Sequence, residues 1–255
     1  MKRTVAVILF LIFSTGLAAF GQSHRQIALQ DGLMLDGIDG KISSGNGLWY
    51  FSLFESLTDG KGSLNANAPV QILPSSMLEK LAGAVSDENK NFRIWGKFTK
   101  YQNRNFIYLS YFIPVTETNQ PPSAEEEPDY ADPNEEKIIP DDVLTMLRPQ
   151  RTINLAELKK PLSTGSDGII ADRTGFLKKT QDGFYFNFDA IGRNIDSLSL
   201  PLLNCEVLED IAKQQSLSAK PLRFKISAIV TGYKGKNYML LQRATRAYSH
   251  GNFGR

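Results

Sequence analysis

One stretch of the chain occurs twice, and this repeat constrains the fold more than any other feature. Residues 92–109 read FRIWGKFTKYQNRNFIYL and residues 224–241 read FKISAIVTGYKGKNYMLL, with six identical positions and no gap. Upstream, further blocks match in the same order: 31–36 with 167–172, 49–51 with 184–186 and 73–79 with 203–209. Because this order is kept over roughly 80 residues, the sequence predicts two copies of one small domain.

Each copy has the pattern of five strands and one helix. Alternating apolar and polar residues predict three strands at 34–42, 48–54 and 70–73, with counterparts at 170–177, 184–189 and 198–203. A short helix follows, for which Ser76 and Glu79 have the spacing of a capping box and Asn204 is a favoured N-cap in the second copy. Two long strands joined by a hairpin complete each copy.

The hairpin and one strand position agree between the copies. Asn103 stands where the second copy has Gly235, and these two residue types adopt positive φ most easily, as a tight hairpin turn requires. Gly96 and Ala228 are both small at one inward position, which suits a crowded barrel interior. Both agreements support the same arrangement of strands in each copy.

Three strands, a helix and two strands in about 80 residues resemble the OB fold, a five-stranded barrel. The resemblance implies a mainly β protein with two OB-like five-stranded barrels, each with one helix between strands 3 and 4, joined by an acidic Pro-rich linker. Another small barrel or sandwich is the alternative, because the same elements can be connected differently. The chain also resembles uncharacterised exported bacterial proteins with paired OB-like units, a resemblance that implies no activity.

The N-terminus has the three-part pattern of an export signal. Lys2 and Arg3 precede nine apolar residues, Val5 to Phe13, and small residues follow up to Gly21. This run is too short to span a bilayer, so we expect a cleaved signal and a periplasmic or secreted protein without a transmembrane anchor. The expected domains are the signal peptide at 1–21, the first OB-like domain at 31–116, the linker at 117–142 and the second OB-like domain at 143–255. The second domain has its repeat core at 167–248, a leading helical segment and a basic tail.

Charge is distributed unevenly along the chain. Residues 31–116 contain eight basic and eight acidic side chains, and the linker contains ten acidic side chains and one lysine. Residues 143–255 contain seventeen basic and nine acidic side chains. The second copy is therefore strongly basic although the whole chain is nearly neutral, which favours an anionic partner.

The sequence argues against most catalysis. The two histidines, His24 and His250, lie near the ends of the chain, and Cys205 is the single cysteine. A nucleophile–histidine pair and a zinc cluster are therefore not expected, and no glycine-rich phosphate loop leads from a strand into a helix. We expect no cofactor and no metal, and we interpret Cys205 as a small structural residue equivalent to Ser75.

The resemblance to OB folds implies a ligand-binding surface. OB folds bind oligonucleotides and oligosaccharides across strands 2 and 3, between the loops that join strands 1–2 and 4–5. In the second copy, lysines fall in these loops and tyrosines lie beside them. The candidate ligand-binding residues are Lys178, Lys179, Tyr185, Tyr233, Lys234, Lys236 and Tyr238. Cations beside exposed rings suit nucleic acid or an acidic glycan. The first copy has Ser43, Ser44 and Gln102 at the corresponding places and keeps only Tyr50 and Arg104.

The leading hypothesis is a non-catalytic exported binding protein whose second barrel recognises an anionic polymer or a protein partner. One alternative is a structural or assembly module of the cell envelope that acts through protein–protein contacts. Another is an enzyme with an unrecognised carboxylate site. The lysines are also compatible with ordinary solvated turn residues. A further alternative is that the acidic linker lies on the basic face of the second barrel and blocks it. The sequence leaves the oligomeric state open.

Overall fold

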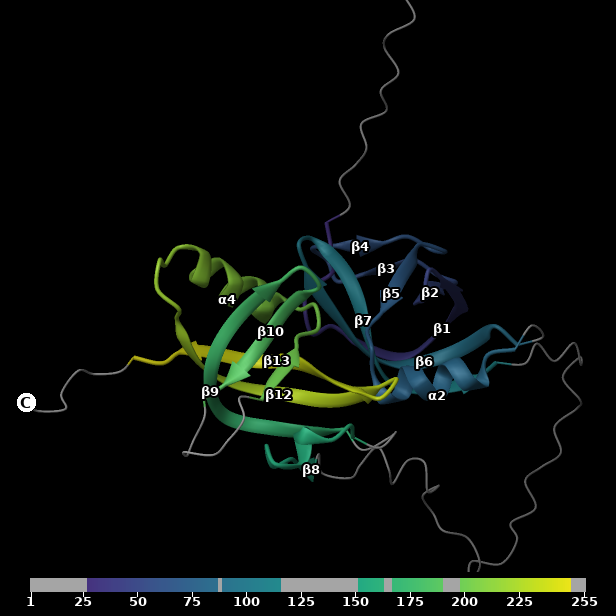
Figure 1. Ribbon diagram of the computed structural model, residues 1–255. Helices are drawn as coiled ribbons and strands as arrows, with labels where there is room; N and C mark the ends of the chain where they lie inside the picture. Colours follow the sequence, from purple (N-terminus) through teal and green to yellow (C-terminus); the bar gives the residue numbers. More distant parts are fainter. Residues whose placement is uncertain (1–26, 87–88, 116–150, 163–166, 190–197, 249–255) are drawn as a thin grey trace, which may run out of the picture.

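The computed structural model describes residues 27–86, 89–115, 151–162, 167–189 and 198–248, which form two β units side by side (Figure 1). The expected signal peptide and the acidic linker at 117–142 lie outside the described residues. Within the described ranges, no helix is both long and apolar enough to cross a membrane.

The first unit is a ring of five strands with one helix. Its strands pair in the order β1-β2-β5-β7-β6, and β6 pairs back with β1, which closes the barrel. The elements are β1 (Met34–Gly45), β2 (Leu48–Leu53), β5 (Pro69–Ile72), α2 (Ser76–Ala84), β6 (Asn91–Tyr101) and β7 (Arg104–Pro114). A separate ribbon consists of β3 (Leu57–Thr58) and β4 (Ser63–Leu64). The helix lies between the third and fourth barrel strands, as predicted.

The second unit repeats this order in a six-stranded sheet. Its path is β11-β10-β9-β12-β13, and β8 pairs with the start of β9. The elements are β8 (Arg151–Thr152), the short 3-10 helix η1 (Glu157–Lys159), β9 (Gly168–Thr180), β10 (Gly183–Phe188), β11 (Ser199–Pro201), α4 (Glu206–Ser216), β12 (Arg223–Tyr233) and β13 (Lys236–Arg246). A single bridge between Leu202 and Met239 joins the two ends of the sheet.

The prediction of a mainly β chain is confirmed, whereas the prediction of two five-stranded barrels is not. In the first unit, both Gln71 and Ile72 pair with β7. In the second unit, Pro201 takes the place of Gln71, because each lies opposite the corresponding tyrosine of the neighbouring strand. Proline has no N–H to donate, so the equivalent ladder shortens to one bridge. The second sheet is therefore open apart from this contact.

The small inward residues and the hairpin turns behave as predicted. Strand register shifts at Gly96 in β6 and at Ala228 in β12. A Cβ on Gly96 would stand 2.4 Å from the carbonyl oxygen of Tyr108, so the space is indeed filled. Asn103 and Gly235 have φ values of 57° and 72°. The residues before them also have positive φ, as two-residue hairpins with a type I′ turn require.

Both helices begin one residue away from the predicted caps. Ser75, not Ser76, is the N-cap of α2, and its Oγ accepts the N–H of Leu78 at 3.1 Å. Cys205, not Asn204, is the N-cap of α4 and makes no capping bond with its side chain. With the cap at position 75, Glu79 falls one residue beyond the capping-box position, so its carboxylate is available for a different contact.

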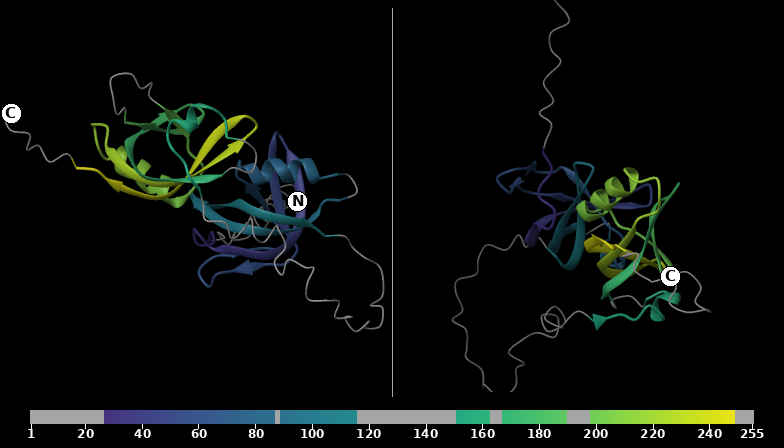
Figure 2. Two further views of the ribbon diagram at one scale, coloured as in Figure 1. Left: turned by 90° about the horizontal axis from the view of Figure 1, so that it is seen from below. Right: turned by 90° about the vertical axis from the view of Figure 1, so that its left-hand side faces the viewer.

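Glu79 contacts the second unit, and an equivalent glutamate of the second unit contacts the first. The Glu79 carboxylate of α2 accepts the backbone N–H of Lys234 at the β12–β13 turn (3.4 Å). At the equivalent place, the Glu209 carboxylate of α4 accepts the N–H of Gln102 at the β6–β7 turn (2.6 Å). Helix α2 packs on β12 and α4 packs on β6, and Figures 1 and 2 show the tip of the β12–β13 hairpin beside α2. The units thus contact each other through the same elements in a near-symmetric way.

Buried polar groups complete the contact. The Thr231 hydroxyl accepts the N–H of Ser76 and donates to the Asp167 carboxylate, both at 2.8 Å. The hydroxyl of Tyr108 also donates to Asp167, at 3.0 Å. On the other side, Thr99 donates to the carbonyl oxygen of Asn204 at 2.8 Å. Buried polar groups are costly without partners, so these bonds fix one relative placement of the two units.

We expect Thr231→Val to lower the free energy of unfolding by about 1–3 kcal/mol, because it leaves the Ser76 N–H and the Asp167 carboxylate short of a partner in a buried site. Urea unfolding followed by circular dichroism measures this. Thr245→Val, at an exposed position of β13, is the matched control and should change stability little. Equal effects of the two substitutions would contradict the role given to Thr231.

Candidate ligand-binding face of the second unit

A row of side chains crosses the outward face of the second unit. Tyr185 on β10 lies opposite Lys178 on β9 and opposite Pro201 on β11. Residues directly opposite each other in a sheet point to the same side, whereas their sequence neighbours point to the other. The neighbours Phe184 and Phe186 pack in or against the core, so Lys178, Tyr185 and Pro201 face outward.

Tyr238 on β13 continues this row. Leu202 and Met239 bridge the two sheet ends and are both buried in the core, so Pro201 and Tyr238, one residue before each, lie on the other side of the sheet. Tyr238 is half-buried there and also packs against the contact between the units. Partial burial raises the pKa of Tyr238, the nearby phenols of Tyr185 and Tyr233 raise it further, and Lys234 acts in the opposite direction. We call Lys178, Tyr185, Pro201 and Tyr238 the tyrosine row.

The β12–β13 turn forms one end of the row. Lys234 and Lys236 are exposed there, and the Lys234 ammonium lies 5.3 Å from the centroid of the Tyr233 ring. The backbone of Lys234 is held by Glu79 of the first unit. These two lysines therefore stand at a fixed turn beside Tyr238.

The predicted residues do not all belong to this surface. Tyr233 is 8% exposed and packs into the hydrophobic cluster of the first unit, with its ring centroid 6.4 Å from that of Tyr238. It is buried between the units, so its ring is not accessible for stacking. Lys179 lies opposite Phe184 and therefore on the inward side of the strand, with its ammonium 5.8 Å from the centroid of that ring. The structure thus brings together Lys178, Tyr185, Lys234, Lys236 and Tyr238.

The first unit has the same row without the lysines. Tyr50 lies opposite Ser43 on β1 and opposite Gln71 on β5, and Gln71 pairs with Phe106 of β7. Phe106, the counterpart of Tyr238, is 4% exposed, and Arg104 lies 5.9 Å from its ring centroid. The first unit therefore lacks two of the lysines, keeps a cation at Arg104, and has the ring of Phe106 buried where the second unit has the half-buried Tyr238.

Sequence reasoning missed two residues on the outward face of the second unit, Phe176 and Arg223. Phe176 of β9 is 37% exposed and lies opposite Arg223 of β12. A signal for it exists in the repeat, because register places Lys41 at the equivalent position of the first unit. An apolar residue that replaces a lysine at an outward position was therefore visible in the sequence.

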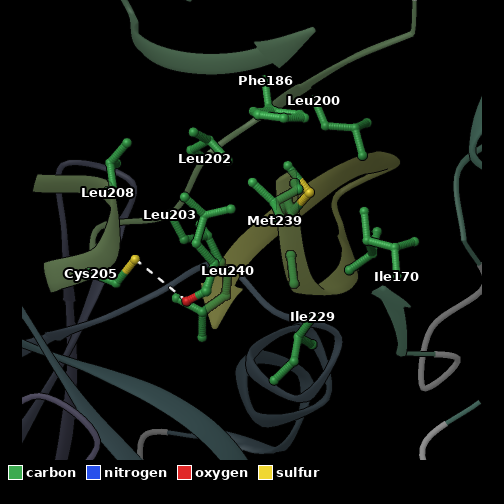
Figure 3. Close-up of a cluster of buried hydrophobic side chains, with 14 of the residues drawn as sticks. Ile170, Phe186, Leu200, Leu202, Leu203, Cys205, Leu208, Ile229, Met239 and Leu240 are labelled. Atoms are coloured by element: carbon green, nitrogen blue, oxygen red, sulfur yellow. Dashed lines mark hydrogen bonds between the residues drawn. The ribbon is translucent and has the colours of Figure 1, made fainter. Parts of the chain in front are cut away.

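The described residues offer little else that points to chemistry. Among them, no group of three or more histidine, cysteine, aspartate or glutamate side chains could hold a metal ion. Cys205 is buried in the second core among Leu203, Leu208 and Leu240 (Figure 3), and its Sγ lies 3.7 Å from the carbonyl oxygen of Leu241. Burial raises the pKa of the Cys205 thiol to about 12.

We therefore expect Cys205 to react very slowly with a thiol reagent such as DTNB at pH 8 in the folded protein, because the reactive thiolate is scarce and buried. Unfolding in urea should restore the rate of an ordinary cysteine. The absorbance change on DTNB reaction measures both rates. A folded-state rate as fast as the unfolded one would contradict the buried position.

No family model matches the chain, and no curated protein matches it. Among solved structures, the wild-type single-stranded DNA binding protein from Thermus aquaticus aligns with 10% identity and a TM-score of 0.22, over 86% of this chain and 95% of that chain. A deletion mutant of the single-stranded DNA binding protein from the same organism aligns with 12% identity and a TM-score of 0.21, over 86% of this chain and 96% of that chain. Likenesses this weak carry no argument about the ligand of this chain.

Proposed function

We propose that this chain is an exported, non-catalytic binding protein whose second unit binds an anionic polymer on the outward face of β9, β10 and β11. The observation that carries the proposal is the tyrosine row, in which Tyr185 lies between Lys178 and Tyr238. Lys234 and Lys236 add positive charge at the end of the row. The N-terminal pattern at residues 1–21 supports export.

Rings next to ammonium groups suit such a ligand for two separate reasons. The ammonium groups attract phosphate, sulfate or carboxylate groups, and the exposed ring faces stack on bases or sugar rings. Tyr185 is half-buried and lies opposite Lys178, so part of its side chain is exposed next to a cationic group. The geometry therefore provides both kinds of contact within one row.

The first unit shows that folding does not require these lysines. Ser43 occupies the position of Lys178, and Gln102 occupies that of Lys234, in a unit with the same strand order. Two exposed positions of the face are therefore lysine in the second unit and neutral in the first, whereas Arg104 keeps the positive charge of Lys236. We attribute this difference to a ligand that the second unit alone meets.

The charge of the whole second copy supports the same proposal. With seventeen basic and nine acidic side chains between residues 143 and 255, it attracts polyanions over a distance, whereas the first copy has no net charge. Binding of this kind releases counterions and therefore weakens steeply as salt rises.

We expect Lys178→Glu to weaken binding of a fluorescein-labelled oligo-dT strand or of labelled heparin about tenfold at low salt, because it replaces an attraction with a repulsion. The double variant with Lys234→Glu should weaken it further. Fluorescence anisotropy, repeated over a salt series, measures the affinity.

Lys41→Glu is the matched control, since it makes the same charge change at an exposed position of β1 in the first unit. It should reduce affinity only slightly. Failure of the unaltered chain to bind either polymer at low salt would overturn the proposal. If Lys178→Glu and Lys41→Glu lost the same amount of affinity, the polymer would be binding to the net charge of the protein rather than to this face.

A further inference from the structure

We infer that the ligand is a single-stranded nucleic acid and that the second unit stacks two of its successive bases, one on Tyr185 and one on Phe176. The inference rests on the proposed function and assigns its ligand class. It depends on Phe176, which lies outside the tyrosine row but on the same face of the sheet.

Phe176 is the diagonal neighbour of Tyr185. It lies opposite Asn187 on β10, while Tyr185 lies opposite Lys178, two residues further along β9. Diagonal neighbours in an antiparallel pair are about 7–8 Å apart and are within reach of aromatic side chains. Both rings are on the outward face, and Phe176 is 37% exposed. An extended single strand, whose bases are not stacked on each other, spans such a spacing with consecutive nucleotides.

The repeat indicates that the ring at this position is not required by the fold. Lys41 pairs with Ser52 and Asn91 in the first unit, as Phe176 pairs with Asn187 and Arg223 in the second. The first unit thus folds with a lysine at this position. At 37% exposure, Phe176 keeps part of its apolar surface in water, which a lysine at the same position would not.

The direction of the exchange is informative. The second copy is the more basic one, yet here it has a phenylalanine where the neutral copy has a lysine. A surface selected only to attract negative charge would retain a lysine at this position. The exchange therefore favours a ligand with flat rings as well as charge.

Cationic groups lie on both sides of Phe176. Lys178 follows it on the outward side of β9, and Arg223 lies opposite it on β12. The Arg223 guanidinium is held by Asp189, with Nε to Oδ2 at 2.6 Å, and it also donates to the Thr174 hydroxyl at 3.3 Å. Asp189 therefore balances the charge of Arg223, and Lys178 is the cation that a phosphate next to a base on Phe176 would meet.

The test is Phe176→Lys, which installs the residue of the first unit. Charge attraction alone predicts tighter binding of oligo-dT, whereas stacking on Phe176 predicts binding roughly tenfold weaker, since one stacked base contributes about 1–3 kcal/mol. A strand of equal length and charge without bases should bind weakly to the unaltered chain, and Phe176→Lys should not weaken that binding. Phe176→Trp should retain the affinity for oligo-dT.

Phe54→Lys is the matched control, because Phe54 is 43% exposed on the first unit and the substitution makes the same change in ring and charge away from the face. It should leave affinity unchanged or slightly higher. Circular dichroism and urea unfolding verify that each variant is folded.

The outcomes separate this inference from the proposed function. If Lys178→Glu weakens binding but Phe176→Lys leaves it unchanged or tighter, the anionic-polymer function stands and base stacking at Phe176 is rejected. If heparin binds and oligo-dT does not, the ligand class is an acidic glycan and the inference is overturned. If neither polymer binds, both proposals fail.

Discussion

The contact between the two units is the constraint on which the rest of the structure depends. Each unit places its last hairpin on the helix of the other, so that Glu79 holds the turn at Lys234 and Glu209 holds the turn at Gln102. Thr231 of β12 accepts the N–H of Ser76 at the start of α2 and donates to the carboxylate of Asp167. The neutral first unit therefore determines where one end of the basic face lies, even though it contributes none of the lysines.

Local patterns predicted the elements well because they depend on local physics. Alternation with a period of two located the strands, and Asn103 and Gly235 located the turns. The cap of α2 was missed by one residue because Ser75 and Ser76 are equally good N-caps in the sequence. The choice between them is made at a distance, since the N–H of Ser76 is bonded by Thr231 of the other unit. The match of the two copies in the sequence also aligned Asp36 with Asp172. The strand pairing shows that Gly37 is the true counterpart of Asp172, and both residues have positive φ.

The candidate face shows the same division between local and distant causes. Tyr185 followed from strand alternation and Lys178 from the expected loop between strands 1 and 2. The structure places Lys178 within β9 rather than in that loop, directly opposite Tyr185. Tyr233 was wrongly expected to be accessible, because only the packing of the first unit buries it. Phe176 was missed because it lies between Gly175 and Leu177, where an apolar residue is easily interpreted as core. The lysine at the equivalent position of the first copy was the one sequence signal against that interpretation, and the pairing with Arg223 places Phe176 on the outward face.

The double anchoring of the hairpins limits how this protein can change over evolutionary time. Insertions in the β6–β7 or β12–β13 turn would pull the chain away from a glutamate of the neighbouring unit, so both turns are confined to their present length. Within the described ranges, no glutamate of the first unit holds the β9–β10 turn: a Cβ on Gly183 would meet nothing within 4 Å, and the Thr180 hydroxyl donates to the carbonyl oxygen of Gly183 in the same turn. Relatives that differ in ligand preference should therefore vary most in this turn, which is the freely evolving border of the face.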